Sequence, residues 1–356
     1  MGCGCFVIIL PQMQKFILAV VLLLGVTFVF LYFSELQQII ATLQRANPWY
    51  LAIALIIQAM WFVVVGLVYQ SIYSLLGLKE SRRHMMLLAV AANFVNVVTT
   101  SAGVGGMALF INDGQRRGQS SGRVTVAGAL YLLIDESAFL CVLAVGTIIL
   151  ARRNRLSYGD IAASLTLLAI ACAIALFLYL GYRSARTLGN VLAGLARTIN
   201  FMVRPFLHRD YLSERRAHTF ASEIAEGLSA LPKKPASLIA PLLLSLLGKI
   251  LLMGVLTCAF LSFNIPFRVG TIIGGFSIAF LFLIVSPTPS GVGVVEGVMA
   301  LALHSPRVGW GSAILITLAY RGVTFWLPLL VGVWAFRMIN SNKVKVKAEE
   351  RTGEPL

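Results

Sequence analysis

Charged residues are scarce in this sequence. Asp, Glu, Lys and Arg make up 12% of its 356 residues, while hydrophobic residues make up 58%. A soluble domain typically carries about 25% charged residues, because its hydrated surface requires them. The deficit indicates a surface that faces lipid, and it excludes a soluble domain large enough to carry out chemistry in water. We therefore predict an all-α polytopic membrane protein.

Motifs for metals, cofactors and covalent catalysis are also missing. The five cysteines form no CxxC pair, the four histidines form no HExxH cluster, and the chain has no ATP-binding loop. We expect no metal, no cofactor and no catalytic residues, so that any transport would be passive or coupled to an ion. Cys3 and Cys5 leave two interpretations open, which are acylation and a plain structural role.

The net charge of +15 at first suggests a nucleic-acid-binding protein. The basic residues, however, sit in short loops between long apolar runs. Such loops set the orientation of membrane helices and contact anionic lipid headgroups. The placement of the charge therefore predicts membrane lipids as partners and no nucleic acid.

The chain contains eight hydrophobic segments. A helix needs about 20 apolar residues to cross the roughly 30 Å of hydrocarbon in a bilayer. Two segments, 85–111 and 270–303, are interrupted by clusters of Gly, Ser, Thr and Pro that favour unwinding. The other six are predicted to span the membrane, at residues 15–33, 50–76, 124–150, 160–182, 237–262 and 311–336.

Charge favours a topology in which both interrupted segments dip into the membrane and return. Most of the 29 Lys and Arg residues then lie on one side, as the positive-inside rule expects, with 152–155 as the exception. This side is the cytoplasmic face of the inner membrane and holds both termini. We predict a transmembrane domain at 15–338, with a basic loop at 183–236 inside it, and a short tail at 339–356.

The two interrupted segments resemble each other and would enter from opposite faces. Each combines Thr, Ser and a Gly-Val-Gly run, then a short apolar piece and a full span. Inverted repeats with a broken helix in each half are typical of transporters, although Gly, Ser and Thr also recur by chance in membrane helices. The residues assigned to the two centres are Thr100, Ser101, Gly105 and Gly106, and Pro287, Thr288, Pro289, Ser290, Gly291 and Gly293.

Ionisable residues inside the apolar segments require an explanation, because a charge in hydrocarbon costs at least about 2.5–3.5 kcal/mol. One interpretation is a polar passage for a lipid headgroup, in which Arg321 or Lys249 binds a phosphate and an acid neutralises the empty site. The other is a set of structural ion pairs. In an inverted repeat the acids of the third span would approach Arg321. The five residues are Asp135, Glu136, Lys249, Glu296 and Arg321.

Uncharged polar residues extend the candidate passage. Asn93 and Asn96 lie one helical turn apart before the first interruption, and Tyr320 precedes Arg321. The two asparagines would either face the passage or form hydrogen bonds between helices.

The loop at 183–236 contains an amphipathic stretch. Its apolar residues fall on one helical face, which is typical of a helix lying in the membrane interface, although a plain connector is equally consistent. The residues of this face are Leu188, Val191, Leu192, Leu195, Ile199, Met202 and Val203.

Three segments carry a family resemblance. Ser286–Gly297 and Ala319–Pro328 resemble a signature of the flippase-like family named after the transmembrane region of lysylphosphatidylglycerol synthase, and Asn93–Gly106 resembles its other signature. The similarity covers about 15–338. The chain departs from it at Thr99 and Thr100, where many members carry a proline.

The resemblance implies a lipid flippase of the bacterial cytoplasmic membrane, with a phospholipid or an isoprenoid- or hopanoid-type lipid as cargo. Only a short tail follows Arg337, so we expect no aminoacyl transfer by this chain. A separate lipid-biosynthesis enzyme would then be a partner. The alternative is a membrane-embedded accessory protein or enzyme of lipid or glycolipid synthesis.

Overall fold

The computed structural model describes residues 41–42, 44–99, 104–151, 158–207, 214–230, 235–286, 288–305 and 307–338. Secondary structure in these residues is helical, and none of them forms a β-strand. The all-α prediction is therefore confirmed. Several predicted features lie outside the described residues: the span at 15–33, the tail at 339–356, Cys3, Cys5, Thr100, Ser101 and Pro287.

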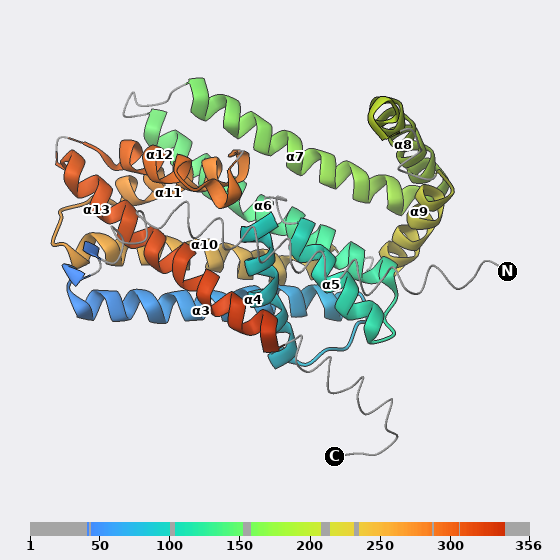
Figure 1. Cartoon of the computed structure of the whole chain (residues 1–356), viewed down its shortest axis with the longest axis horizontal. Helices are drawn as coiled ribbons and strands as arrows, with labels where there is room; N and C mark the ends of the chain where they lie inside the picture. Colours follow the sequence, from blue (N-terminus) through green and yellow to red (C-terminus); the bar gives the residue numbers. More distant parts are fainter. Residues whose placement is uncertain are drawn as a thin grey trace, which may run out of the picture.

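Four helices within the described residues are long and apolar enough to cross a bilayer. They are Pro48–Leu75, Ser121–Ile149, Ala236–Ser262 and Trp310–Met338, and they correspond to the predicted spans at 50–76, 124–150, 237–262 and 311–336. In Figure 1 they are α3 (Pro48–Leu75), α6 (Ser121–Ala151), α10 (Ile239–Ser262) and α13 (Trp310–Arg321) with its continuation. The polytopic membrane class is thereby supported, while the count of six spans stays a prediction.

Helix α3 illustrates how the sequence sets the ends of a span. Asn47 caps its start by accepting a hydrogen bond from Trp49 N at 3.0 Å, and Pro48 occupies the first turn, where no amide donor is needed. Gly77 follows its end with a φ of 70°, which a glycine adopts without strain. Between these ends, exposed apolar side chains such as Ile56 and Met60 leave a surface suited to lipid.

Helices α4 (Arg82–Thr99) and α5 (Val104–Arg116) fold back on each other as a hairpin. At its outer end, His84 Nε2 lies 2.7 Å from Asp113 Oδ2. At its inner end, Gly106 N donates to Asn96 Oδ1 at 2.6 Å. With 13 residues, α5 extends only about 20 Å.

Helices α11 (Val269–Val285) and α12 (Val294–Leu303) form a second hairpin. Gly275 near its outer end leaves room for the Leu303 side chain. The inner turn includes η2 (Pro289–Gly291) and takes left-handed dihedrals at Ser290, Gly291 and Gly293, with φ of 49°, 70° and 81°. Two of these three positions are glycine, which explains why the sequence can turn here. With 10 residues, α12 extends about 15 Å.

The two hairpins open at opposite ends of the bundle. Helices α3 and α10 lie side by side, and Asn47 N donates to Ser262 O at 2.9 Å, so α3 begins where α10 ends. The α4–α5 hairpin follows the end of α3, while the α11–α12 hairpin follows the end of α10, at the other end of the bundle (Figure 1). Both interrupted segments therefore form helical hairpins, while their re-entry into the membrane stays a prediction.

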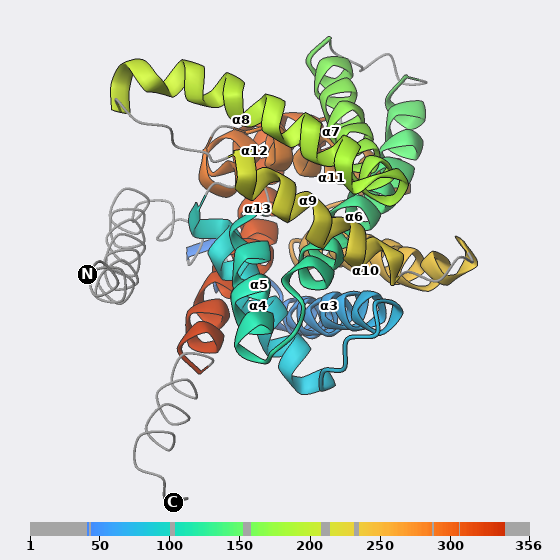
Figure 2. The same ribbon diagram turned by 90° about the vertical axis from the view of Figure 1, so that its right-hand side faces the viewer.

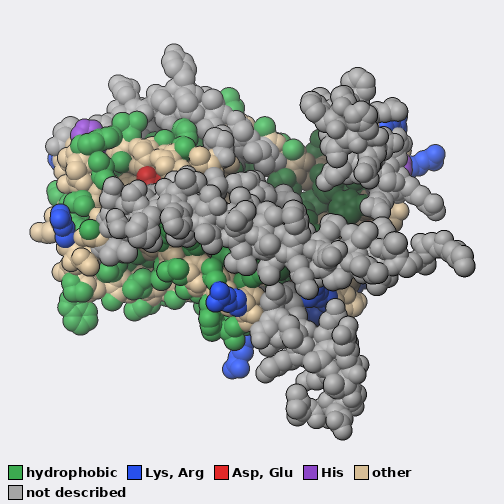
Figure 3. Space-filling view, in the orientation of Figure 1, with side chains coloured by type: hydrophobic (Ala, Val, Ile, Leu, Met, Phe, Trp, Pro, Cys, Tyr) green, Lys and Arg blue, Asp and Glu red, His purple; other side chains and the backbone are tan. Residues whose placement is uncertain are grey.

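The inner ends of the hairpins meet in a small apolar cluster. Val97 at the end of α4 packs with Val292 beside η2, and both pack with the continuation of α13, where Phe325 and Trp326 are buried. Larger clusters surround it, one among α3, α4, α6 and α9 and one among α6, α10, α11, α12 and α13. On the face shown in Figure 3, the described outer surface is mostly hydrophobic.

Three further helices complete the bundle: α7 (Tyr158–Arg183), α8 (Ala185–Leu207) and α9 (Glu214–Ser229). Helix α7 corresponds to the predicted span at 160–182, and α8 and α9 lie across one end of the bundle (Figure 2). Helix α9 packs closely on α6. The absence of a side chain at Gly227 allows this contact, since a Cβ atom there would lie 2.8 Å from Gly122 O.

Part of the predicted amphipathic face packs in the core of the protein. Leu188 is fully buried in the cluster that contains α3, α4 and α6, and Leu192 packs against that cluster. Val191 is exposed. The side chains of Leu195, Ile199, Met202 and Val203 lie outside the described residues. Leu188 therefore does not face the membrane surface, as the interfacial alternative would require, since an apolar stripe also arises where a helix packs on other helices.

Candidate functional site

Arg321 and Glu296 form a buried ion pair beside the inner turn of the second hairpin. Arg321 is 4% exposed, and its Nε atom donates to Glu296 Oε1. Its Nη2 atom donates to Ser290 O at 3.1 Å, and its guanidinium lies 4.3 Å from the centre of the Phe325 ring. The cation is thus held by a carboxylate, a backbone carbonyl of the turn and an aromatic face.

Local helix chemistry places both partners. Glu296 lies in the first turn of α12, where its Oε2 atom accepts a hydrogen bond from Gly293 N at 2.7 Å. A carboxylate suits this position because it satisfies a free helical amide and the positive end of the helix dipole. Arg321 ends the α-helical part of α13 and is followed by a π-helical turn, η3 (Gly322–Trp326). Such turns frequently occur at functional sites.

The first hairpin reaches the same place. Ser290 Oγ donates to Val97 O at 3.4 Å, which joins the inner turn of the second hairpin to the end of α4. One residue earlier, Asn96 binds the amide of Gly106 and so closes its own hairpin, while Asn93 is half-buried one turn before it. The structure therefore assigns to Asn96 the hydrogen-bonding role that the sequence left as an alternative to lining a passage.

A second buried ion pair joins α10 to α6. Lys249 Nζ donates to Asp135 Oδ2 at 2.8 Å and lies 4.1 Å from the centre of the Phe280 ring on α11. The lysine side chain is 5% exposed and the aspartate side chain 25%. A narrow cavity of about 10 Å³ borders the pair and also touches Trp61 and Tyr131. That volume holds about one water molecule, so the bundle is closed at this point.

Unpartnered polar atoms surround the second pair. Glu136 Oε2 is buried without a hydrogen bond to any described residue, and the same is true of Ser245 Oγ and of both amide atoms of Gln58. Ser245 also lines the narrow cavity. Buried polar groups without partners are rare and unfavourable, so they often indicate a site that an ion, water or ligand uses. Sequence reasoning missed Gln58 and Ser245, whose signal was an uncharged polar side chain within a mainly apolar span.

Other predicted site residues shape the turns or the core. Thr288 Oγ1 donates to Val292 O at 3.0 Å, and Pro289 and Gly291 form η2. Tyr320 is 7% exposed and belongs to the core cluster of α10 to α13. Gly105 lies in the first turn of α5, next to Gly106. The expected approach of Asp135 to Arg321 is wrong, because each of them pairs with another residue, Lys249 and Glu296 respectively.

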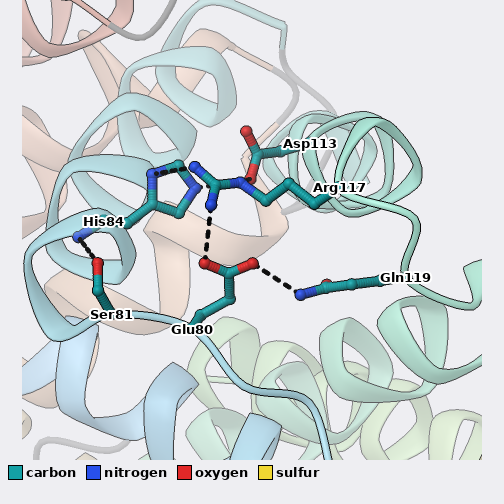
Figure 4. Close-up of polar contacts among 6 residues, drawn as sticks. All are labelled: Glu80, Ser81, His84, Asp113, Arg117 and Gln119. Carbon is teal, nitrogen blue, oxygen red and sulfur yellow. Dashed lines mark hydrogen bonds and ion pairs between the residues drawn. The ribbon is translucent and has the colours of Figure 1, made fainter.

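A polar network at the outer end of the first hairpin was not predicted (Figure 4). Arg117 contacts Glu80 Oε2 at 3.1 Å and Asp113 Oδ2 at 3.3 Å, and its Nη2 atom donates to His84 Nδ1 at 3.1 Å. His84 Nδ1 therefore accepts, so its proton is on Nε2 and is donated to Asp113. Gln119 Nε2 donates to Glu80 Oε1 at 2.7 Å. In the sequence, Arg117 is one of the basic residues of the short loops, and nothing there indicates its partners.

Long apolar helices, buried ion pairs between them and many exposed large hydrophobic side chains define an α-helical integral membrane protein. Residues 16–332 match the model of the lysylphosphatidylglycerol synthase TM region family, and the chain belongs to that family. It is similar to a UPF0104 membrane protein of Methanothermobacter thermautotrophicus, with 21% identity over 305 residues that cover 84% of this chain and 88% of that protein. The resemblance drawn from Ser286–Gly297 and Ala319–Pro328 is confirmed.

Proposed function

We propose that this protein is a lipid flippase that moves a lipid between the leaflets of the bacterial inner membrane without covalent chemistry. The observation that carries the proposal is the meeting of two helical hairpins from opposite ends of the bundle beside the buried Arg321–Glu296 pair. Broken helices that bring polar groups together inside the membrane are the usual construction of a transporter site. The cargo would be a phospholipid or an isoprenoid- or hopanoid-type lipid.

The proposed topology has six spans and two re-entrant hairpins arranged as an inverted repeat, with both termini cytoplasmic. It is supported by the placement of α4–α5 after α3 and of α11–α12 after α10 at the opposite end. The lengths of α5 and α12, about 20 and 15 Å, are too short to cross roughly 30 Å of hydrocarbon. Membrane lipids are the proposed partners, and a separate enzyme would synthesise the cargo.

Arg321 is the proposed phosphate-binding residue. Its planar group of donors matches two phosphate oxygens, and in the empty site Glu296 and Ser290 O occupy these donors. A phosphate would replace the carboxylate in one step of the cycle. The narrow cavity beside Lys249 and Asp135 lies between α3, α6 and α10 and is too small for a headgroup, so transport would require the bundle to open. The glycine-rich inner turn and the π-helical turn are suited to such a movement.

The experiment measures lipid movement in liposomes that contain the purified protein and a fluorescent, headgroup-labelled phosphatidylglycerol. A membrane-impermeant quencher reports the fraction of label that reaches the outer leaflet. We expect Arg321→Ala to abolish the protein-dependent movement. Arg307→Ala is the matched control, because Arg307 is exposed in the loop before α13 and contacts no part of the proposed site.

A double variant separates a transport site from a structural ion pair. Replacement of both charges, in Arg321→Met with Glu296→Leu, leaves no unpaired buried charge and is expected to preserve folding. If the pair only holds helices together, the folded double variant should still move lipid at the wild-type rate, and that result would overturn the site assignment. We expect the variant to fold as a monodisperse helical protein and to move no lipid.

A further inference from the structure

An open pocket of about 790 Å³ lies between the loop after α3 and the turn between α5 and α6. It is bordered by the network of Figure 4 and is separate from the two buried ion pairs. Among its lining residues are Lys79, Glu80, Arg117, Gln119, Ser120 and Arg123. The pocket sits at the end of the span Pro48–Leu75, which is the level at which lipid headgroups meet a membrane protein.

The charges of the pocket favour an anion. Three of its lining side chains are basic and one is acidic. Arg117 is already neutralised by Glu80 and Asp113. Lys79 and Arg123 therefore supply positive charge that the described acids do not balance. Arg123 is half-buried, and its Nε atom is buried without a hydrogen bond to any described residue. A buried guanidinium donor without an acceptor is unfavourable, so a bound ligand that supplies an acceptor would be favoured here.

Two helix N-termini adjoin the same pocket. Helix α4 begins at Arg82, directly after the lining residue Ser81, and α6 begins at Ser121, directly after Ser120. Neither helix has an acidic residue in its first turn. The first amides of a helix are free donors, and the helix dipole places about half a positive charge there. Both helices therefore add to the attraction that the basic side chains exert on an anion.

The pocket also contains an unused acceptor. Gln119 donates through Nε2 to Glu80, which fixes its amide, and its Oε1 atom is buried without a donor among the described residues. A ligand that carries a hydroxyl or ammonium group close to a phosphate would satisfy both Arg123 and Gln119. The headgroup of a phospholipid has this composition.

We propose that this pocket binds the phosphate group of an anionic phospholipid headgroup, with Arg123 and Lys79 as the binding residues. The exposed Arg82, Arg83 and Arg116 nearby would concentrate anionic lipid around it. The site does not depend on lipid transport. The binding proposal is tested by lipid affinity alone, whereas the flippase proposal is tested by the movement of lipid and its dependence on Arg321.

The experiment measures binding to the full chain, delipidated in detergent, by native mass spectrometry. Phosphatidylglycerol and zwitterionic phosphatidylcholine are titrated separately. We expect the variant with Lys79→Gln and Arg123→Gln to bind phosphatidylglycerol about tenfold more weakly than wild type, with little change for phosphatidylcholine. The matched control replaces Arg268 and Arg307 by Gln, two exposed arginines at the other end of the bundle, and should bind like wild type.

The conservative variant Arg123→Lys keeps the charge and should retain most of the affinity, which separates a binding role from misfolding. Equal loss of phosphatidylglycerol affinity in the double variant and the control would overturn the proposal. In a second arm, inorganic phosphate is added alone and as a competitor. If it binds as tightly as phosphatidylglycerol, phosphate recognition holds but the lipid headgroup as its source is wrong.

Discussion

Gly106 is the position at which the α4–α5 hairpin should be most sensitive to a single added methyl group. An ideal Cβ atom at this residue would lie 2.7 Å from Asn96 Nδ2, 2.8 Å from Asn96 Oδ1 and 3.0 Å from Ala92 O. The last of these atoms belongs to the helix backbone and cannot rotate away. Gly106→Ala must therefore push the two helices apart at the point where Gly106 N binds Asn96 Oδ1.

Three contributions set the change in the free energy of unfolding that Gly106→Ala causes. Overpacking typically costs about 1–3 kcal/mol. A weakened hydrogen bond adds about 0.5–1.5 kcal/mol. Alanine regains about 1 kcal/mol through its higher helix propensity. We expect a net loss of about 0.5–3.5 kcal/mol in the free energy of unfolding, measured by equilibrium unfolding in mixed micelles and followed by far-ultraviolet circular dichroism.

Gly297 provides the matched control in the other hairpin. It lies within α12, and an added Cβ would meet no described atom within 4 Å. Gly297→Ala should therefore stabilise the protein by up to about 1 kcal/mol, the opposite sign. Combining Gly106→Ala with Asn96→Ala removes the two closest side-chain atoms, and the double variant should be more stable than the sum of the single effects predicts. Gly106→Ala with wild-type stability would refute this account of the hairpin.

Two further predictions concern the bundle around the site. Asp135→Asn leaves the buried Lys249 cation without its carboxylate and should lower the free energy of unfolding by about 3 kcal/mol, the low end for a broken buried pair because the Asp135 side chain is 25% exposed. The double variant with Asp135→Leu and Lys249→Met should recover most of this loss, and an equal loss of stability in the single and the double variant would contradict the reasoning. Gly227→Ala should loosen the contact of α9 with Gly122 and increase hydrogen exchange in α9, whereas Gly194→Ala, whose added Cβ meets no described atom within 4 Å, should not.

The spans and the helix breaks could be predicted from the sequence because their signals are local. A run of about 20 apolar residues marks a span whatever surrounds it. The four helices that are long and apolar enough to span begin and end within a few residues of the predicted bounds. The left-handed dihedrals at Gly291 and Gly293 likewise follow from residue type.

The pairing of the charges could not be predicted in the same way. Asp135 and Lys249 are 114 residues apart, and which carboxylate meets which cation depends on the rotation of each helix about its axis. The rotation is set by packing, for example by the close contact of Gly122 with α9, and leaves no pattern in a single apolar segment. For the same reason the apolar stripe at 188–203 did not reveal that Leu188 packs in the core.

The two buried ion pairs share a geometry that bears on how a phosphate would enter. In each pair the cation side chain is 5% exposed and the carboxylate is more exposed, at 13% for Glu296 and 25% for Asp135. Each cation also lies against an aromatic ring, Phe325 or Phe280. An anion that approaches from the exposed side therefore meets the carboxylate first and is repelled. If Arg321 binds a phosphate as proposed, Glu296 would have to turn away first, and the returning carboxylate would then displace the phosphate. In a flippase, this competition would allow one residue both to bind a headgroup and to release it.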